Sequence, residues 1–278
     1  MGISRATYYH RSVREKEQLQ KDLELKEMIE KVHLLFPGYG YRRLRRHFLK
    51  QGQRVNTKRI KRVMKIYSIF ATHTPTMKPR GTHTALKLRY PNLIRGLKVT
   101  GPDQVWATDI TYIKLLREYV YLSAILDVYT RRIVGWAVSK NLGHEFCLKA
   151  LQLAIRKRKP KAGIIHHSDR GIQYVCQPYV ECLLKSGFKI SMNSVGTPEE
   201  NAYIESFFKT LKREEVYARN YQTMRNVIAN LPKFIDEIYN LKRMHSSLDY
   251  QSPDEFEKQV MKLKPAERPA LKIWGRLV

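Results

Sequence analysis

Three strand-like segments follow one another closely between residues 104 and 139 of this 278-residue chain. They read QVWATDITYIKL (104–115), EYVYLSAILDVYT (118–130) and RRIVGWAVS (131–139), and all are rich in Val, Ile, Tyr and Trp. Residues of these types favour strands, and the short polar breaks between the segments are typical of hairpins. This part of the chain therefore predicts three hairpin-connected strands, and any fold proposed for the chain must contain their sheet.

Helices and further strands alternate after residue 139. Three hairpin strands followed by such an alternation predict a mixed α/β layer structure. We expect helices over 145–158, 174–185 and 201–216, a strand that ends at Asp169, a short strand over 188–192, and helical structure over 223–241 with an irregular tail after it.

The charge of the chain is strongly positive and unevenly distributed. The formal net charge is +27, and between residues 31 and 100 there are 18 Lys and Arg residues but no Asp or Glu. A long segment without carboxylates repels itself unless a polyanion neutralises it, so nucleic acid is the predicted partner. A solvated basic surface is the alternative.

The basic segment belongs to a region of short helices. A helix over 12–35 is followed by Pro37 and Gly38, which end it, and by a second helix in which Leu44 and Phe48 are four residues apart. Asn56 is a suitable N-cap for a third helix with a strongly basic face. The pattern predicts a helix-turn-helix, although any small helical hairpin with a solvated basic face would look similar. The candidate DNA-binding residues are Arg42, Arg43, Lys58, Arg59 and Arg62.

Several classes of protein are excluded by composition. No run approaches the roughly 18 apolar residues of a membrane span, and the N-terminus has no apolar signal-peptide core. The three cysteines form no C-x-x-C pair, so neither a disulfide framework nor a cysteine zinc site is indicated. We therefore expect a cytoplasmic protein.

Three acidic residues occupy positions that need an explanation. Asp109 lies inside the first strand, where a carboxylate is costly unless it is paired, hydrogen-bonded or bound to a cation. Asp169 follows a strand, where an ordinary solvent-facing turn is the alternative. Glu205 lies on a helix with Lys209 and Lys212 on the same face, which could be only a surface ion-pair ladder.

If these three carboxylates lie close together in the folded chain, they can form a cation-binding site. Like charges held close together resist joint ionisation, so the cluster would be stable only with cations among its members. Carboxylate oxygens suit Mg²⁺, and two such ions roughly 4 Å apart can activate an attacking oxygen and stabilise a leaving one in phosphodiester chemistry. Lys209 and Lys212 would then hold the phosphates of the substrate.

The segments around these acids carry a strong resemblance to a known family. WATDITY, HHSDRGIQY and NAYIESFFKTLK, with 35 residues between Asp169 and Glu205, resemble the D,D(35)E signature of transposases and retroviral-type integrases. The chain is most similar to the second-frame protein of the IS3 family of insertion-sequence transposases. YGYRRL and VNTKRIKRVM upstream, and YNLKRMHSSLDYQSPDEF downstream, also resemble that family, so the similarity spans nearly the whole chain.

The resemblance implies an RNase H-like catalytic core preceded by a small helix-turn-helix-like domain. It also implies a site for two Mg²⁺ ions, for which Mn²⁺ can substitute, made by Asp109, Asp169 and Glu205. Asn201 would orient the site, and His167 would contact phosphate or support the loop. The implied domains are a helical DNA-binding region (1–70), a basic linker (71–100), an integrase core (101–222), and a C-terminal helical segment and tail (223–278).

The implied activity is DNA transposition in two parts. Water cleaves a strand at the end of the element, and the released 3′-hydroxyl then attacks a second phosphodiester, without a covalent enzyme intermediate. The implied partners are terminal-repeat DNA, target DNA and further copies of the chain. The opening GISRATYYH resembles the end of a recognition helix, so we expect an upstream-frame protein or fusion to supply the rest of the DNA reader.

Two other functions stay open at this point. A metal-dependent nuclease that only hydrolyses would use the same carboxylates, and a non-catalytic DNA-binding regulator would need none of them. The sequence also departs from the family pattern in the polar loop before Glu205. Glu200 stands where the family commonly has Asp, and Val195 precedes Gly196 where a basic residue is usual, which concerns the substrate contacts of the loop and not the triad.

Other residues have simpler interpretations. For Asp127 a structural role is favoured over metal binding, and His166 lacks a third ligand at a suitable spacing for a metal site. Arg243 and His245 are equally compatible with a DNA contact and with fixing the tail to the core. The two tryptophans of the strands are expected in the core: Trp106 and Trp136.

Overall fold

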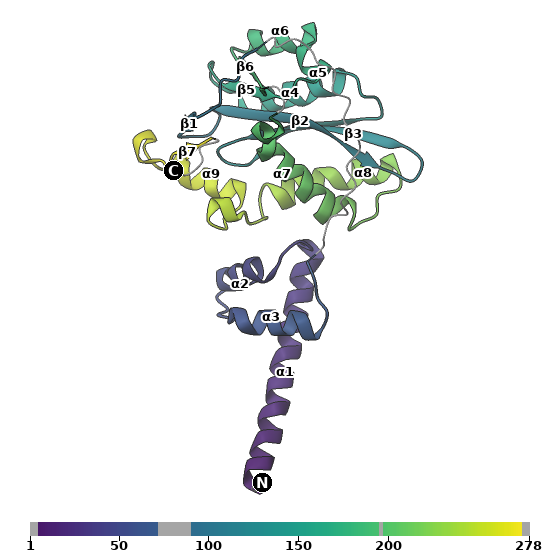
Figure 1. The fold of residues 1–278 in the computed structure, drawn as a ribbon, viewed down its shortest axis with the longest axis vertical. Coiled ribbons are helices and arrows are strands. Elements are labelled where there is room, and N and C mark those ends of the chain that lie inside the picture. Colours follow the sequence, from purple (N-terminus) through teal and green to yellow (C-terminus); the bar gives the residue numbers. More distant parts are fainter. Residues whose placement is uncertain (1–4, 72–89, 195–196, 274–278) are drawn as a thin grey trace. The chain divides into compact units, whose positions relative to one another are not determined.

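The computed structural model describes residues 5–71, 90–194 and 197–273. The chain divides into two compact units, residues 1–73 and residues 74–278 (Figure 1). Each unit buries its own apolar residues.

The N-terminal unit is a bundle of the three expected helices. These are α1 (Arg5–Leu35), α2 (Tyr41–Lys50) and α3 (Thr57–Ile66), so α1 begins earlier than predicted. The Asn56 side chain caps α3 by accepting a hydrogen bond of 2.8 Å from the Lys58 backbone N–H, as its residue type indicates. The buried residues of this bundle include Ile29, Leu44, Phe48, Ile60 and Val63.

The C-terminal unit is built on a five-stranded sheet. Strands β2 (Val105–Lys114), β3 (Tyr119–Asp127) and β4 (Ile133–Ser139) pair antiparallel, as predicted. Strands β5 (Ile165–Ser168) and β6 (Lys189–Met192) extend the sheet in parallel on the other side of β2, in the order β4-β3-β2-β5-β6. A meander extended by parallel strands is the mixed sheet of an RNase H-like core, and the predicted fold class is confirmed.

Helices cover both faces of this sheet (Figure 1). On one face lie α4 (Glu145–Arg158), α5 (Ile172–Val175) and α6 (Gln177–Lys185). On the other lie α7 (Ala202–Leu211), α8 (Met224–Pro232) and α9 (Pro253–Met261). The core between α4 and the sheet includes Trp106, Ile125, Ala150, Leu151 and Ala154.

The helix predicted over 174–185 is in fact two helices. The chain is extended at Cys176, with φ −68° and ψ 147°, between α5 and α6. Pro178 lies in the first turn of α6, where its missing N–H is tolerated, so a new helix begins here. The predicted helix over 201–216 starts as a 3-10 turn, η1 (Pro198–Asn201), and ends as a π-helical turn, η2 (Lys212–Val216).

The C-terminal part of the chain is more regular than predicted. Helix α8 continues as a π-helical segment, η3 (Lys233–Tyr239), and the tail expected to be irregular contains α9. Ser252 begins α9 with a capping box, because its hydroxyl accepts from the Glu255 N–H while the Glu255 carboxylate accepts from the Ser252 N–H.

The predicted linker extends too far toward the core. Residues 72–89 lie outside the described residues, but residues 90–100 belong to the C-terminal unit. Ile94 and Val99 are buried, and β1 (Lys98–Val99) pairs antiparallel with β7 (Leu271–Lys272). The basic composition of the segment concealed these apolar anchors. Among the residues described, no helix is long and apolar enough to cross a membrane.

Candidate active site

Strands β2 and β5 bring Asp109 and Asp169 to the same level of the sheet. The two strands pair in parallel, with Val105 opposite Ile165 and Ala107 opposite His167. Asp169 follows directly after the end of β5. Continued by two residues, this register sets Asp109 beside Asp169, and side chains at matching positions of neighbouring parallel strands share a face.

Helix α7 carries Glu205 against the same strands. It packs on β2 and β3 through an apolar face, while Glu205 itself is half-buried. Burial first, and then the negative charges of Asp169 and Glu205, raise the pKa of the Asp109 carboxyl well above its ordinary value. The structure therefore brings all three predicted carboxylates close enough to act on one another. The apolar face of α7 consists of Ile204, Phe207, Phe208 and Leu211.

The local backbone holds each aspartate in place. The Ile110 N–H donates a hydrogen bond of 2.8 Å to Asp109 Oδ1, which lowers the pKa of Asp109 against the larger effect of burial. The Gly171 N–H donates one of 2.9 Å to Asp169 Oδ1. A Cβ atom at position 171 would lie only 3.0 Å from the same Oδ1 atom, so the glycine allows this close turn. Asp169 is thus both a turn residue and a member of the cluster.

The donor atoms of the cluster suit a hard divalent cation. All three side chains offer carboxylate oxygens, the ligands of Mg²⁺, and their mutual repulsion is what a cation would relieve. Asn201 donates from Nδ2 to the Thr108 carbonyl (3.0 Å), while its buried Oδ1 has no hydrogen-bond partner among the described residues. Among the described residues, no group of three or more His, Cys, Asp or Glu side chains is placed so that it could hold a metal ion, so the three carboxylates do not form a preassembled metal site.

The two predicted phosphate-binding lysines are placed differently. Lys209 is exposed and its Nζ lies 3.4 Å from Glu205 Oε2, which is the ion pair of the ladder interpretation. Lys212 is partly buried, with its Nζ 4.1 Å from the centre of the Tyr112 ring. Burial lowers the pKa of Lys212 while the Asp109 charge raises it, so the ammonium group lies within electrostatic range of Asp109.

His167 supports the loop beside the site. Its Nδ1 lies 2.9 Å from Ser191 Oγ and its Nε2 lies 2.6 Å from Asn193 Oδ1. An amide oxygen only accepts, so Nε2 carries the proton and Nδ1 accepts from the serine. Burial lowers the pKa of His167 to about 4, and both ring nitrogens are occupied. Of the two roles implied for His167, the structure therefore shows loop support and leaves no ring nitrogen for a phosphate.

Two further residues organise the loop and were not predicted to do so. Glu200 accepts from the Ser194 N–H (2.6 Å) and from the Ser194 hydroxyl (3.2 Å), which closes the loop that precedes η1. Arg170 donates from Nε to the Asn193 carbonyl (2.9 Å), which ties the turn after Asp169 to the same loop. Residues 195 and 196 lie outside the described residues. The sequence carries no signal for the contact of Arg170, because its acceptor is a backbone carbonyl, which a residue of any type provides.

Two further candidates have structural roles. Asp127 is buried and accepts from the Thr130 N–H (2.7 Å), the Thr130 hydroxyl (2.9 Å) and the Asp103 N–H (2.6 Å). His166 is buried beside the Tyr179 hydroxyl, 3.0 Å from its Nε2. The interpretation of Asp127 as a structural residue therefore holds, and His166 belongs to the core.

The C-terminal candidates and the tryptophans also differ in burial. Arg243 is buried against Glu214 and fixes the tail to the core. His245 packs edge-on against Tyr239. Trp106 is fully buried as expected, but Trp136 is only half-buried, and its indole N–H lies 3.4 Å from Asp236.

In the N-terminal unit, an acidic residue of α1 forms ion pairs with two of the predicted DNA-binding residues. Arg59 Nε lies 3.1 Å from Asp22 Oδ1, and Arg62 Nη2 lies 2.7 Å from Asp22 Oδ2. Arg42 and Lys58 are exposed, whereas Arg43 is half-buried, with its guanidinium 5.7 Å from the Tyr39 ring. The basic face expected on α3 is thus partly turned toward α1.

The sequence matches known families along most of its length. Two models described as "Integrase core domain" match residues 99–198 and 186–253, and one described as "HTH-like domain" matches residues 20–75. The transposase for insertion sequence element IS904 of Lactococcus lactis is 36% identical over 245 residues, which cover 87% of this chain and 96% of that protein. The transposase for IS629 of Shigella sonnei is 31% identical over 93% of this chain and 89% of its own length.

The chain belongs to the IS3 family of insertion-sequence transposases. It is a DDE-type polynucleotidyl transferase with an integrase core, and DNA transposition is its function. Among solved structures, the transposase is similar to the catalytic core domain of HTLV-2 integrase, with 16% identity and a TM-score of 0.44 over 59% of this chain and 99% of that chain.

Proposed function

We propose that Asp109, Asp169 and Glu205 are the catalytic carboxylates of this transposase. The observation that carries the proposal is the placement of these residues: the register of β2 and β5 sets Asp109 beside Asp169, and α7, which carries Glu205, packs on β2. The raised pKa of Asp109, caused by burial and then by the two other carboxylates, agrees with this placement. Three half-buried acids from a strand, a turn and a helix repel one another, and groups perturbed in this way concentrate at functional sites.

The same residues would hold two divalent cations, Mg²⁺ or Mn²⁺. When bound, such a pair supplies Lewis acidity on both sides of the scissile phosphodiester. The chain itself contributes orientation and charge. The Ile110 and Gly171 N–H groups fix the two aspartates, and the Lys212 ammonium would hold a substrate phosphate next to them. Lys209 would reach a second phosphate after releasing Glu205.

The proposed reaction has two successive steps at this site. Water breaks the phosphodiester at the end of the element and leaves a 3′-hydroxyl. That hydroxyl then forms a new phosphodiester with target DNA as one bond of the target strand breaks, so the number of phosphodiesters is conserved. The buried thiols and hydroxyls near the cluster are not required as nucleophiles. Asn201, anchored to the carbonyl that precedes Asp109, keeps η1 and the start of α7 on β2.

The partners we propose are terminal-repeat DNA, target DNA and further copies of the transposase on that DNA. An upstream-frame protein or fusion partner stays a prediction. The HTH-like region over residues 20–75 and the overlapping segment 31–100 support the DNA partner, because that segment has 18 basic and no acidic residues and needs phosphate neutralisation.

The test combines labelled terminal-repeat DNA, a plasmid, the purified protein and Mg²⁺ or Mn²⁺. We expect covalent joining of the label to the plasmid, abolished by Glu205→Gln and by Asp169→Asn. Glu237→Gln is the matched control, since Glu237 is exposed and its replacement removes the same charge at a position outside the cluster. Nicking without joining would support the nuclease instead, and binding with neither reaction would support the regulator. If the Glu205→Gln variant joined the labelled DNA to the plasmid at the normal rate, the assignment of the three carboxylates as catalytic would be refuted.

A further inference from the structure

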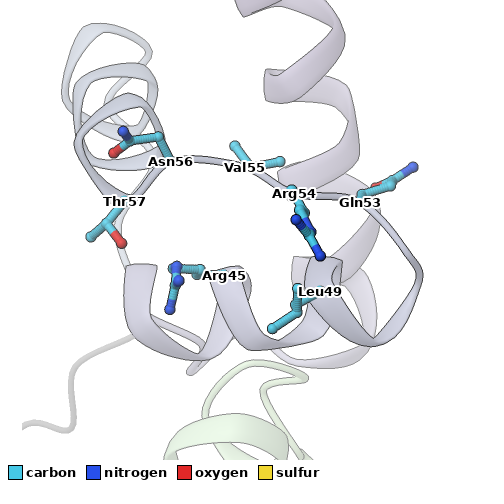
Figure 2. A pocket seen from close by; sticks show the side chains of 7 residues that line it. All are labelled: Arg45, Leu49, Gln53, Arg54, Val55, Asn56 and Thr57. Atoms are coloured by element: carbon cyan, nitrogen blue, oxygen red, sulfur yellow. The ribbon is translucent and has the colours of Figure 1, made fainter.

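A concave surface lies between α2 and the start of α3 in the N-terminal unit. Figure 2 shows that α2 contributes one wall, and that the turn after α2 and the first residue of α3 contribute the other. The residues that line it are Arg45, Leu49, Gln53, Arg54, Val55, Asn56 and Thr57.

The cations of this surface are available, unlike Arg59 and Arg62 of α3. Arg45 and Arg54 are both exposed, and within the described part of the chain neither forms an ion pair or a side-chain hydrogen bond. Arg59 and Arg62, in contrast, both contact the carboxylate of Asp22, which is 6% exposed. Asp22 also accepts a hydrogen bond of 2.9 Å from Gln18.

The surroundings of the surface suit DNA. No acidic residue occurs between residues 31 and 100, so no carboxylate of this segment repels a phosphate there. Gln53 offers an amide that can pair with a base edge, and Leu49, which is 40% exposed, offers an apolar contact of the kind that a thymine methyl makes. Positive, polar and apolar groups are thus combined in one concavity.

We propose that this concave surface, and not the Arg59–Arg62 face of α3, contacts the DNA of the element's ends. The inference rests on the proposed binding of terminal-repeat DNA. Arg45 on α2 and Arg54 on the turn bind backbone phosphates from opposite walls, and Gln53, which precedes Arg54, is the residue that would pair with a base edge. Binding through Arg59 and Arg62 would take their charges from Asp22 and leave a buried carboxylate without its partners, which is strongly unfavourable.

The test measures binding of terminal-repeat DNA to the full chain by fluorescence anisotropy over a series of salt concentrations. The double variant Arg45→Gln, Arg54→Gln is compared with Arg59→Gln, Arg62→Gln, which removes the same charge from the same unit. Each phosphate contact contributes about 0.9 to the slope of log K against log salt. We expect the first variant to lose at least about tenfold in affinity and about 1.8 in slope, with an unchanged thermal midpoint.

The second variant should keep the slope and lose thermal stability instead. If it does not fold, Lys65→Gln replaces it, since Lys65 is exposed on α3 outside the concave surface. An unchanged slope in the Arg45, Arg54 variant, or an equal loss of slope in the control, would overturn the assignment of the surface. Absence of binding by the unaltered chain would overturn the proposed DNA partner as well, so the two failures are distinguishable.

Discussion

Replacing Arg243 with Gln should destabilise the C-terminal unit without removing a DNA contact. The Arg243 guanidinium is 2% exposed and binds Glu214 through two parallel contacts, Nε to Oε2 at 2.7 Å and Nη2 to Oε1 at 2.8 Å. Glu214 is 4% exposed and lies in η2, directly after the helix that carries Glu205. The pair therefore joins the C-terminal segment to the end of α7.

The expected loss follows from the charge that remains. Removing one partner of a buried, hydrogen-bonded ion pair typically lowers the free energy of unfolding by about 3–5 kcal/mol. Arg213 also contacts Glu214, at 2.8 Å from Oε1, and continues to neutralise part of its charge in the variant. We therefore expect the lower end, about 3 kcal/mol, which for a unit of this size shifts the thermal midpoint by roughly 6–12 °C.

Urea unfolding and thermal scans of the purified chain measure this loss. The matched control is Lys140→Gln, because Lys140 Nζ also lies 2.9 Å from a glutamate, Glu118, but the two side chains are 55% and 40% exposed. Exposed ion pairs contribute about 0–1 kcal/mol, so the control should lose little. A loss below about 1 kcal/mol in Arg243→Gln, together with a smaller salt slope in DNA binding, would show that Arg243 is a DNA contact and would refute the reasoning.

Three further predictions concern pH, the carboxylates and packing. Burial alone would raise the pKa of Glu214, but Arg243 and then Arg213 outweigh burial and hold the pKa below 4.5. The stability that the ionised group contributes is therefore present above pH 4.5 and is lost as the pH falls through the lowered pKa. Unfolding midpoints measured between pH 7 and 3 will show this loss, and the Glu214→Gln variant should show a weaker pH dependence. Asp169→Asn should raise the thermal midpoint in a chelator, since it removes a repulsive charge, and should weaken the stabilisation that added Mn²⁺ produces; a lower midpoint in chelator would contradict the repulsion. Gly135→Ala should lower the free energy of unfolding by about 1–3 kcal/mol, because the new Cβ would lie 2.4 Å from the Ala150 carbonyl oxygen, and an unchanged urea midpoint would show that α4 moves away freely.

Local patterns were sufficient for three strands and for marking Asp109 as unusual, whereas the grouping of Asp109 with Asp169 and Glu205 came from the resemblance to a family. Runs of β-branched and aromatic residues predicted β2, β3 and β4, and the position of Asp109 inside such a run marked it as unusual. The capping box at Ser252 and Glu255 was also a readable signal of α9, and it was missed. The pairing of β1 with β7 could not be read in this way, because it joins Val99 to Leu271 across most of the C-terminal unit.

The choice among the basic residues of α3 shows why charge and periodicity together were insufficient. Helical spacing states which side chains share a face, but it does not state which face meets a neighbouring helix. Asp22, a residue of α1 outside the acid-free segment, decides this by binding Arg59 and Arg62. The same acid that withdraws two cations from α3 leaves Arg45 and Arg54 as cations that face solvent. The excess of positive charge therefore indicates a polyanionic partner, while the contacts of Asp22 indicate that Arg59 and Arg62 are not free to bind it.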